Sequence, residues 1–425
     1  MELFARRVRL SGRPDHRLAW LAERSGVLLG NADHTLLGVG QLHEIPLTLA
    51  DPASRSEITA LLRGIPISGD EGPSESLPRA HAALPFDPSS AGSVVIPSVQ
   101  IFATPDESWM TFVEQSASDL ETSEFTLSEL LSVVTAPDGP TPNVRQLVEA
   151  PDQGAFVTEV AAGLQLITAG HLSKLVLSRS ILLELERPID PAGVLARLFE
   201  REPSCTLYSA PSPRGQFVGA SPELLMERSG TSIRTFPLAG TRPQSDDRGA
   251  ALSGSAKDLE EHRLVVVDIA ERLESLAERL DVPEHPSIVS LRSVQHLGTE
   301  ITGELSDQKD PRGFVLELLA AIHPTPAVAG VPSLEAMTAI RSIEGDDREC
   351  FAGAVGWLNG LGDGEWVLGI RGAILSNQSV VIRAGAGVVE GSTPTGELEE
   401  TRVKLSSILS AVVPDGPTLP RREKA

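Results

Sequence analysis

The chain has 425 residues, of which 41% are hydrophobic and 22% are charged, as in a globular protein that buries a large core in two or three domains. Its formal net charge of −22 argues against nonspecific binding to nucleic acid or to an anionic membrane. No apolar run approaches the roughly 18 residues of a membrane span, and the first residues lack the apolar stretch of a signal peptide. Cys205 and Cys350 form neither a zinc motif nor a disulfide framework. We therefore predict a cytoplasmic protein without nucleic-acid or membrane partners.

Residues 1–150 predict a strand-rich region, because short apolar runs alternate with Gly and Pro. Residues 26–30 and 35–40 predict a hairpin, and residues 93–102 predict longer strands. Residues 67–80 predict a polar loop, and residues 136–152, rich in Pro, Asp and Gly, predict a connection between two halves of the chain.

Residues 151–413 are denser in regular structure. Helical periodicity predicts helices at residues 156–169, 192–201, 259–280 and 396–412. Strands are predicted at residues 174–179, 206–209, 216–219, 353–358, 365–375 and 379–384. Helices segregated from long antiparallel strands favour an α+β fold over a doubly wound parallel sheet. We treat residues 1–150 as part of the same unit and predict that residues 414–425 form a disordered tail.

Two acidic helix faces lie far apart in the sequence. Asp258 and Glu261 form one i, i+3 pair, and Glu397 and Glu400 form the other. If the fold brings both pairs together, their negative charge would require a hard cation such as Mg²⁺. The alternative is ordinary helix chemistry, in which Ser255 begins a capping box and the charges lie on solvated faces.

Lys174 and Glu223 are candidates for proton transfer. Lys174 begins a strand whose alternation places it on one face with Val176 and Ser178. Such a lysine is usually solvated, but desolvation in a cavity would favour the neutral amine and allow it to act as a general base. Glu223 follows a Ser-Pro turn and precedes an apolar pair, so it is either an ordinary turn acid or a carboxyl kept protonated as a general acid.

A second group of residues favours anion binding. Arg371 lies in an apolar strand and needs an anionic partner, either a structural carboxylate or a substrate carboxylate. Gly385, Ala386 and Gly387 follow a strand, and this spacing allows backbone N–H groups to converge on an anion. His296 on its own is more typical of a structural histidine.

Taken in order, these segments resemble the chorismate-utilising enzymes, and most closely the isochorismate synthases. The resemblance covers residues 155–412, whereas the N-terminal third is only loosely similar. The matching segments are Lys174–Arg179, Gly219–Leu225, Pro237–Arg242, Lys257–His262, His323–Gly330, Gly353–Trp357, Ile370–Arg371, Ala384–Gly387 and Glu397–Lys404.

The resemblance implies a role for each candidate residue. Glu261 and Glu400 would bind Mg²⁺, supported by Asp258 and Glu397, and the metal would hold the ring carboxylate of chorismate. Lys174 would activate water to attack C2, while Glu223 would protonate the departing C4 hydroxyl. Arg371, Lys404 and the amides of residues 385–387 would bind the enolpyruvyl carboxylate. The implied substrate-binding set is Thr241, His296, Ala327, Arg371, Gly385, Ala386, Gly387 and Lys404.

Three positions bear on the reaction that the resemblance implies. Lys174 argues against the anthranilate synthases, which use ammonia with a glutaminase partner, and Ala239 argues against the aminodeoxychorismate synthases, where a lysine typically occupies this position. Ala327 stands where members that eliminate pyruvate tend to carry Thr. The implied enzyme is an isomerase of the hydroxyl-transferring class, an isochorismate synthase. The alternatives are a salicylate synthase and, from another class, a noncatalytic acidic metal-binding protein.

The resemblance also implies the architecture. It predicts a single α+β unit with two large antiparallel sheets facing each other and helices outside, in which residues 151–413 bind chorismate. We expect a monomer without a glutaminase subunit. The product could serve menaquinone or siderophore biosynthesis, and the sequence does not distinguish these two pathways.

Overall fold

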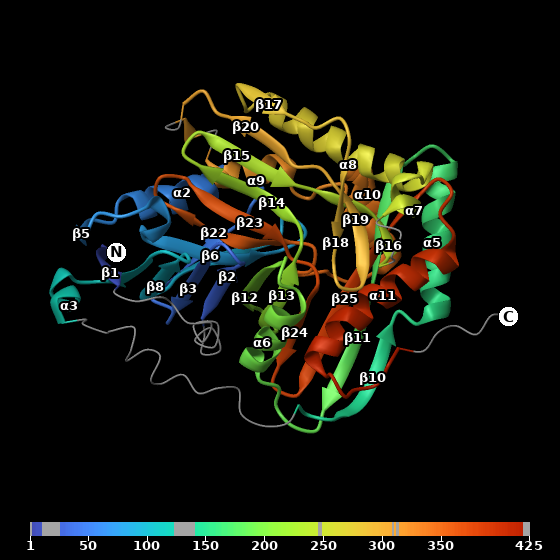
Figure 1. The fold of residues 1–425 in the computed structure, drawn as a ribbon, viewed down its shortest axis with the longest axis horizontal. Helices are drawn as coiled ribbons and strands as arrows, with labels where there is room; N and C mark the ends of the chain where they lie inside the picture. The colour runs from blue at the N-terminus through green and yellow to red at the C-terminus, as the bar shows by residue number, and fades with distance from the viewer. Residues whose placement is uncertain are drawn as a thin grey trace.

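The computed structural model describes residues 2–10, 26–122, 141–244, 249–307, 310–311 and 314–419. Within these residues the chain forms two large sheets and a small one, which together carry the helices on their outer surfaces (Figure 1). Almost all strand pairs are antiparallel, and the exception is the parallel pair of β1 and β5. The predicted α+β class and the two facing antiparallel sheets are therefore confirmed.

The larger sheet contains strands from both ends of the chain. In spatial order its strands are β10 (Val144–Ala150), β11 (Lys174–Leu185), β25 (Ser379–Val389), β24 (Gly372–Ser376), β13 (Gly215–Ser221), β12 (Thr206–Ser212), β2 (Val27–Gly30), β3 (Thr35–Val39), β8 (Val99–Ala103), β9 (Ser108–Glu114), β1 (Phe4–Leu10) and β5 (Ile67–Gly69), and β21 (Gly330–Val331) pairs with β11. Because β12 pairs with β2, the N-terminal strands extend the sheet that carries β11 and β25.

The second sheet repeats this arrangement. Its order is β17 (Arg279–Asp281), β20 (Ile301–Glu304), β15 (Ser232–Phe236), β14 (Leu224–Ser229), β23 (Gly364–Leu368), β22 (Ala354–Asn359), β6 (Arg79–Leu84), β7 (Gly92–Ile96) and β4 (His43–Leu47). The small sheet has the order β16 (Leu238–Pro243), β19 (Val294–Gly298) and β18 (Ser287–Ser290). A buried apolar cluster joins Val27 and Leu29 of the larger sheet to Val355 and Trp357 of the second. This cluster lies between the sheets and fixes their spacing.

The described residues also form helices, several of which pack on the strands of the site. They are α2 (Pro52–Arg63), α3 (Ala117–Thr122), α5 (Gln153–Thr168), α6 (Pro191–Arg201), α7 (Ala250–Ser253), α8 (Ala256–Glu274), α9 (Val315–Ile322), α10 (Ser333–Glu344) and α11 (Pro394–Val412), with a 3₁₀ turn at Ser74–Ser76. Helix α11 packs on β25 and α5, and α8 packs on β16, so the two acidic helices lie at the same end of the molecule (Figure 1). No helix in the described ranges is both long enough and apolar enough to cross a membrane.

Several predicted boundaries were wrong. Residues 67–69 form β5, an edge strand whose backbone pairing needs no apolar pattern, and residues 144–150 form β10 rather than a connection. Helix α8 ends at Glu274 because the following segment joins the second sheet as β17, where Leu280 pairs with Gly303. The predicted strand 365–375 is two strands, β23 and β24.

The structure describes residues 414–419, the first part of the predicted disordered tail. Residues 414–419 follow α11, and Leu419 is buried in the apolar cluster that contains Ile408 and Leu409. Residues 420–425 of the predicted tail and residues 136–140 of the predicted connection lie outside the described residues.

Candidate active site

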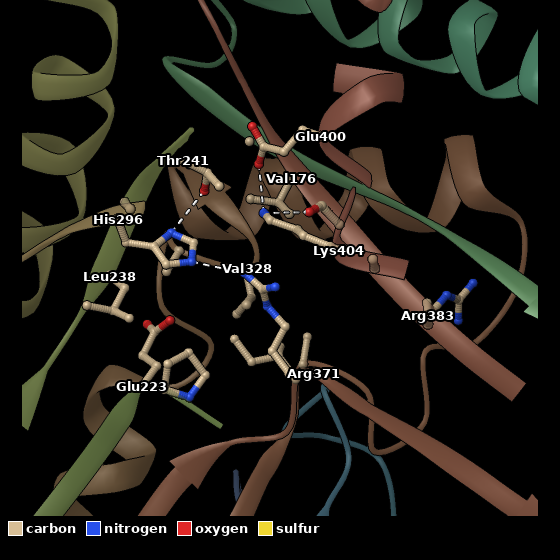
Figure 2. A pocket seen from close by; sticks show the side chains of 18 of the residues that line it. Val176, Glu223, Leu238, Thr241, His296, Val328, Arg371, Arg383, Glu400 and Lys404 are labelled. Carbon is tan, nitrogen blue, oxygen red and sulfur yellow. Dashed lines mark hydrogen bonds and ion pairs between the residues drawn. The ribbon is translucent and has the colours of Figure 1, made fainter. Parts of the chain in front are cut away.

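A cavity, partly open to solvent, lies between the small sheet, strands β11 and β25, and the two acidic helices. Ten of the predicted site residues border it: Glu223, Thr241, Glu261, His296, Ala327, Arg371, Gly385, Gly387, Glu400 and Lys404. Figure 2 shows that the labelled side chains of Glu223, His296, Arg371 and Lys404 surround one space. The fold thus brings together residues that are far apart in the sequence.

Both acidic helices begin at this cavity. Ser255 caps α8 by accepting a hydrogen bond from the Asp258 N–H at 3.3 Å, and Thr393 caps α11 by accepting one from the Gly396 N–H at 3.2 Å. The capping role predicted for Ser255 is therefore present together with the acidic face. Because the N-terminus of a helix is the positive end of its dipole, both helices stabilise carboxylates in their first turns.

Each of the four carboxylates contacts a cationic side chain. The ion pairs are Lys174 Nζ to Glu261 Oε1 at 3.1 Å, Lys257 Nζ to Glu397 Oε1 at 2.9 Å, Lys404 Nζ to Glu400 Oε1 at 2.7 Å, and Arg242 Nε to Asp258 Oδ2 at 2.9 Å. Lys257 belongs to α8 and Glu397 to α11, so this pair joins the two acidic faces. The two faces therefore form one cluster of alternating charge.

The charges of this cluster act on one another. Burial, and then the negative charge of Glu400, raises the pKa of Glu397 to about 7. Burial alone would lower the pKa of Lys257, but the attraction of Glu397, followed by Glu261 and Glu400, raises it. The Lys257 ammonium therefore interacts with carboxylates from both helices.

The donor chemistry of the cluster fits a hard divalent cation such as Mg²⁺, because carboxylate oxygens are the ligands that such ions prefer. Glu261 and Glu400, the two predicted first ligands, both border the cavity. A Cβ on Gly387 would overlap the Glu261 carboxylate, so this glycine of β25 leaves room for that side chain. Within the described residues, no three acidic or histidine side chains already face a common metal position.

Arg371, His296 and Thr241 form a hydrogen-bonded chain along one wall of the cavity (Figure 2). Arg371 Nη2 lies 2.9 Å from His296 Nε2, and His296 Nδ1 lies 3.0 Å from Thr241 Oγ1 and 3.3 Å from the Gly240 carbonyl oxygen. A guanidinium can only donate and a carbonyl can only accept, so Nε2 is the acceptor and Nδ1 carries the proton. Burial, with the charges of Arg371 and Lys404, holds the pKa of His296 well below its ordinary value and keeps the ring neutral.

This chain orients the Thr241 hydroxyl. Since Thr241 Oγ1 accepts from the His296 Nδ1–H, its own proton is free to be donated toward the cavity. Thr241 and His296 face each other across β16 and β19, so the small sheet fixes their distance. The structure therefore makes His296 a positioning residue with two partners, rather than an isolated structural histidine.

The backbone of Arg371 explains why the predicted strand 365–375 is broken. Arg371 has φ of 54°, a left-handed conformation that is uncommon for a residue with a side chain. The Tyr208 hydroxyl donates to the Ile370 carbonyl oxygen at 3.0 Å and so supports this turn. A Cβ at Gly372 would overlap that hydroxyl, which accounts for the glycine after Arg371. Backbone strain of this kind is characteristic of functional sites and here aims Arg371 into the cavity.

Lys404 and Gly385 lie on the opposite wall. Lys404 Nζ donates to the Gly385 carbonyl oxygen at 3.0 Å as well as contacting Glu400 (Figure 2). Gly385 and Gly387 border the cavity, whereas Ala386 alternates to the other face of β25 and contributes no side chain to the lining. Arg371 and Lys404 therefore place two positive charges on the same space.

Glu223 provides a carboxyl with altered acidity. Its side chain is buried, and this burial raises its pKa to about 8 against the opposing effects of the Leu238 N–H and the nearby cations. The Glu223 carboxyl points into the cavity in Figure 2. A carboxyl in this state is protonated at neutral pH and can donate a proton to a bound molecule.

Lys174 does not border the cavity itself but lies behind Glu261, which does. Its side chain has 0% exposure, and its Nζ is next to Glu261, which borders the cavity. The predicted strand alternation is present, since Val176 on the same face of β11 borders the cavity. A movement of the Glu261 carboxylate away from Nζ would open the lysine to the cavity.

Some residues of the site were not predicted. Arg348 borders the cavity, donates to the carbonyl oxygens of Val328 and Val176 at 2.8 Å each, and pairs with Glu344 at 2.5 Å in a buried ion pair. It thereby fixes the segment that carries Ala327 to strand β11. Phe351, Ile370 and Lys257 were also missed as site residues. Arg348 and Phe351 immediately precede the matching segment at 353–357, so their position in the sequence was the available signal.

The chain is similar to several known proteins. The family described as "Chorismate binding enzyme" matches residues 27–413. The isochorismate synthase DhbC of Bacillus subtilis is 39% identical over 351 residues, which are 80% of this chain and 81% of the relative. A crystal structure of a 2,3-dihydroxybenzoate-specific isochorismate synthase, DhbC from Bacillus anthracis, has a TM-score of 0.78 and 31% identity and covers 93% of this chain and 98% of that one. The menaquinone-specific isochorismate synthase MenF of Escherichia coli has a TM-score of 0.79 and 26% identity and covers 96% of this chain and 94% of that one.

Proposed function

The chain belongs to the family of chorismate-binding enzymes, and we propose that it is an isomerase that converts chorismate to isochorismate. The observation that carries this proposal is that one cavity is bordered by a protonated Glu223, two cations, Arg371 and Lys404, and two carboxylates, Glu261 and Glu400. Chorismate is a dianion with two carboxylates. Arg371 and Lys404 offer a positive site for one of them, and a cation held by Glu261 and Glu400 would offer a site for the other despite the net charge of −22.

Arg371 and Lys404 bind the enolpyruvyl carboxylate. Arg371 is held by His296, and Lys404 is held by Glu400 and the Gly385 carbonyl oxygen, so both cations are positioned before the substrate arrives. Thr241 donates its hydroxyl proton to a substrate oxygen, because the His296 Nδ1–H occupies its acceptor. Preorganised donors of this kind reduce the cost of ordering the site during the reaction.

Lys174 and Glu223 carry the proton transfers. Lys174 takes a proton from the water that attacks C2, and Glu223 gives its proton to the C4 hydroxyl as it leaves. One water adds and one is lost, so the product is an isomer of the substrate. The pKa of about 8 at Glu223, caused mainly by burial, supports its role as the acid.

Mg²⁺ is the proposed cofactor, held by Glu261 and Glu400 with support from Asp258 and Glu397. Bound there, it would neutralise the ring carboxylate of chorismate and draw electron density from the ring. Glu261 contacts Lys174, so its recruitment to a cation would also separate it from the proposed base.

The reaction is expected to stop at isochorismate. Ala327 presents a methyl group to the cavity, where a hydroxyl could assist the loss of pyruvate. Formation of salicylate is therefore not favoured.

We also propose a monomer that works in the cytoplasm without a glutaminase subunit. Both Cys205 and Cys350 are buried free thiols, which supports a reducing compartment.

Product analysis tests this proposal. The purified chain, incubated with chorismate and Mg²⁺, should form isochorismate without pyruvate, as followed by chromatography. Salicylate with equimolar pyruvate would support a salicylate synthase instead. If the folded protein showed no turnover, the noncatalytic metal-binding alternative would replace both enzyme assignments.

His296→Leu should raise the KM for chorismate by about tenfold or more while changing kcat less. The substitution removes the acceptor of an Arg371 hydrogen bond, and bonds to charged groups contribute about 1.5–3 kcal/mol. Arg371 binds the carboxylate before and during the reaction, so the loss should fall mainly on KM. His296→Gln keeps one donor and one acceptor and should recover part of the affinity. Equal defects in both variants, or a loss confined to kcat, would contradict the positioning role.

A further inference from the structure

A second cavity lies on the other side of Glu400. Thr241 and Glu400 border both cavities, whereas Asp258, Glu397, Lys257 and Arg242 border only the second. We name this space the outer cavity and the space around Arg371 the substrate cavity. The carboxylate cluster of α8 and α11 therefore forms the wall between two separate openings.

The cluster is electrically balanced, since its four carboxylates contact four cationic groups. A divalent cation bound by Glu261 and Glu400 would add two positive charges to this balanced cluster, which favours the departure of a cationic side chain. The side chain of Lys174 has 0% exposure and that of Lys404 16%, and Lys404 is also held by the Gly385 carbonyl oxygen. The side chains of Lys257 and Arg242 are 32% and 44% exposed, so these two can move into solvent.

Lys257 is the better candidate of the two. Arg242 contacts Asp258, which lies on the α8 side of the cluster. Lys257 reaches from α8 to Glu397 on α11, and Glu261 and Glu400 attract its ammonium as well. Its ammonium thus contacts Glu397, the proposed supporting carboxylate, and is attracted by both proposed metal ligands.

The use of lysine in the chain supports this choice. The sequence contains only five lysines among 36 basic residues, and three of the five, Lys174, Lys257 and Lys404, contact the carboxylate cluster. An ammonium is a compact charge on a flexible stem, which suits a group that must leave one partner and return to it.

We propose that Lys257 is the counter-ion that the divalent cation replaces: the metal ion enters through the outer cavity, and the Lys257 side chain leaves Glu397 for solvent. The substrate enters through the other cavity, so metal and chorismate use different routes to the shared wall at Glu400. This inference rests on the metal role proposed above for Glu261 and Glu400.

Binding of Mn²⁺, followed by electron paramagnetic resonance in the absence of chorismate, tests the exchange. Lys257→Met should bind Mn²⁺ about tenfold or more tightly than the unaltered chain, because one positive charge is removed from beside the ion. Arg263→Met is the matched control, since it removes a charge from the same helix that is paired with Glu260 outside the cluster. Its Mn²⁺ affinity should change by less than about twofold. Lys257→Arg, which keeps the charge, should not bind more tightly than the unaltered chain.

A labelling experiment on the unaltered chain makes the test independent of how the variants fold. Acetylation of Lys257 by an amine-reactive ester, measured by mass spectrometry, should increase severalfold on addition of Mg²⁺. Unchanged Mn²⁺ affinity in Lys257→Met, or unchanged labelling of Lys257, would overturn the exchange and leave the metal assignment standing. Absence of Mn²⁺ binding in all proteins would instead overturn the metal assignment itself.

Discussion

Lys174→Ala is expected to reduce kcat about 10²- to 10⁴-fold, which is the usual contribution of a general base. The substitution removes the amine that takes a proton from the attacking water. Chorismate should still bind, because Arg371 and Lys404 lie on other walls of the cavity and keep their partners. Steady-state kinetics together with calorimetric binding of chorismate would separate these two effects.

Lys174→Arg is the control that distinguishes a base from a counter-ion. Arginine keeps a positive charge beside Glu261 but stays protonated, so it cannot accept a proton from water. If Lys174 is the base, both variants should be inactive, and small primary amines should restore part of the activity of Lys174→Ala. Substantial activity in Lys174→Arg would show that the lysine serves only to balance Glu261. Thermal unfolding of each variant checks that the buried site still folds.

Glu223→Gln is expected to reduce kcat by a similar factor, because glutamine cannot donate the proton that the C4 hydroxyl needs to leave. Glutamine has nearly the same shape and is neutral, as the protonated Glu223 carboxyl is. Fold and substrate binding should therefore be preserved, and the loss should appear in kcat.

The pH dependence of the unaltered chain gives an independent measure of Glu223. Burial raises its pKa to about 8, and only the protonated form can act as the acid. The value of kcat/KM should thus fall about tenfold per pH unit as the pH rises above about 8. The residual activity of Glu223→Gln should lack this decrease. The same alkaline decrease in both proteins would assign it to another group and remove Glu223 from the acid role.

Much of the site could be predicted because some of its features depend only on residues that are neighbours in the sequence. The i, i+3 spacing of Asp258 and Glu261 specifies a helix face, and Ser255 specifies where that helix begins. The order of the matching segments then identified Arg371, Glu223 and the two acidic faces as parts of one site before any contact was known. The cavity that these residues share is consistent with that order.

Contacts between distant elements could not be predicted in this way. Nothing in the segment around Lys257 indicates that its ammonium reaches Glu397, since this contact depends on how α8 and α11 pack on different sheets. The left-handed backbone conformation of Arg371 could not be predicted for a similar reason. Its sequence is that of a continuous strand, and the turn is supported by Tyr208, which lies on β12.

In the N-terminal third, individual strands could be predicted from the sequence, but their pairing with distant strands could not. The alternation of residues 26–30 and 35–40 predicted a hairpin, which β2 and β3 confirm. That β2 would pair with β12 was not evident, because an exposed strand edge can accept any strand of suitable length. Edge strands such as β5 and β10 were mistaken for loops because edge pairing uses the backbone and imposes little pattern on the side chains.

The most direct test of the central claim is the reaction of chorismate with Mg²⁺ in water enriched in ¹⁸O, with the products separated and weighed by mass spectrometry. If Lys174 activates a water that adds at C2 while Glu223 assists loss of the C4 hydroxyl, isochorismate should be the sole product and should carry one ¹⁸O atom per molecule. Isochorismate without the label would contradict the addition of solvent water, and labelled salicylate with pyruvate would contradict a reaction that stops at isochorismate.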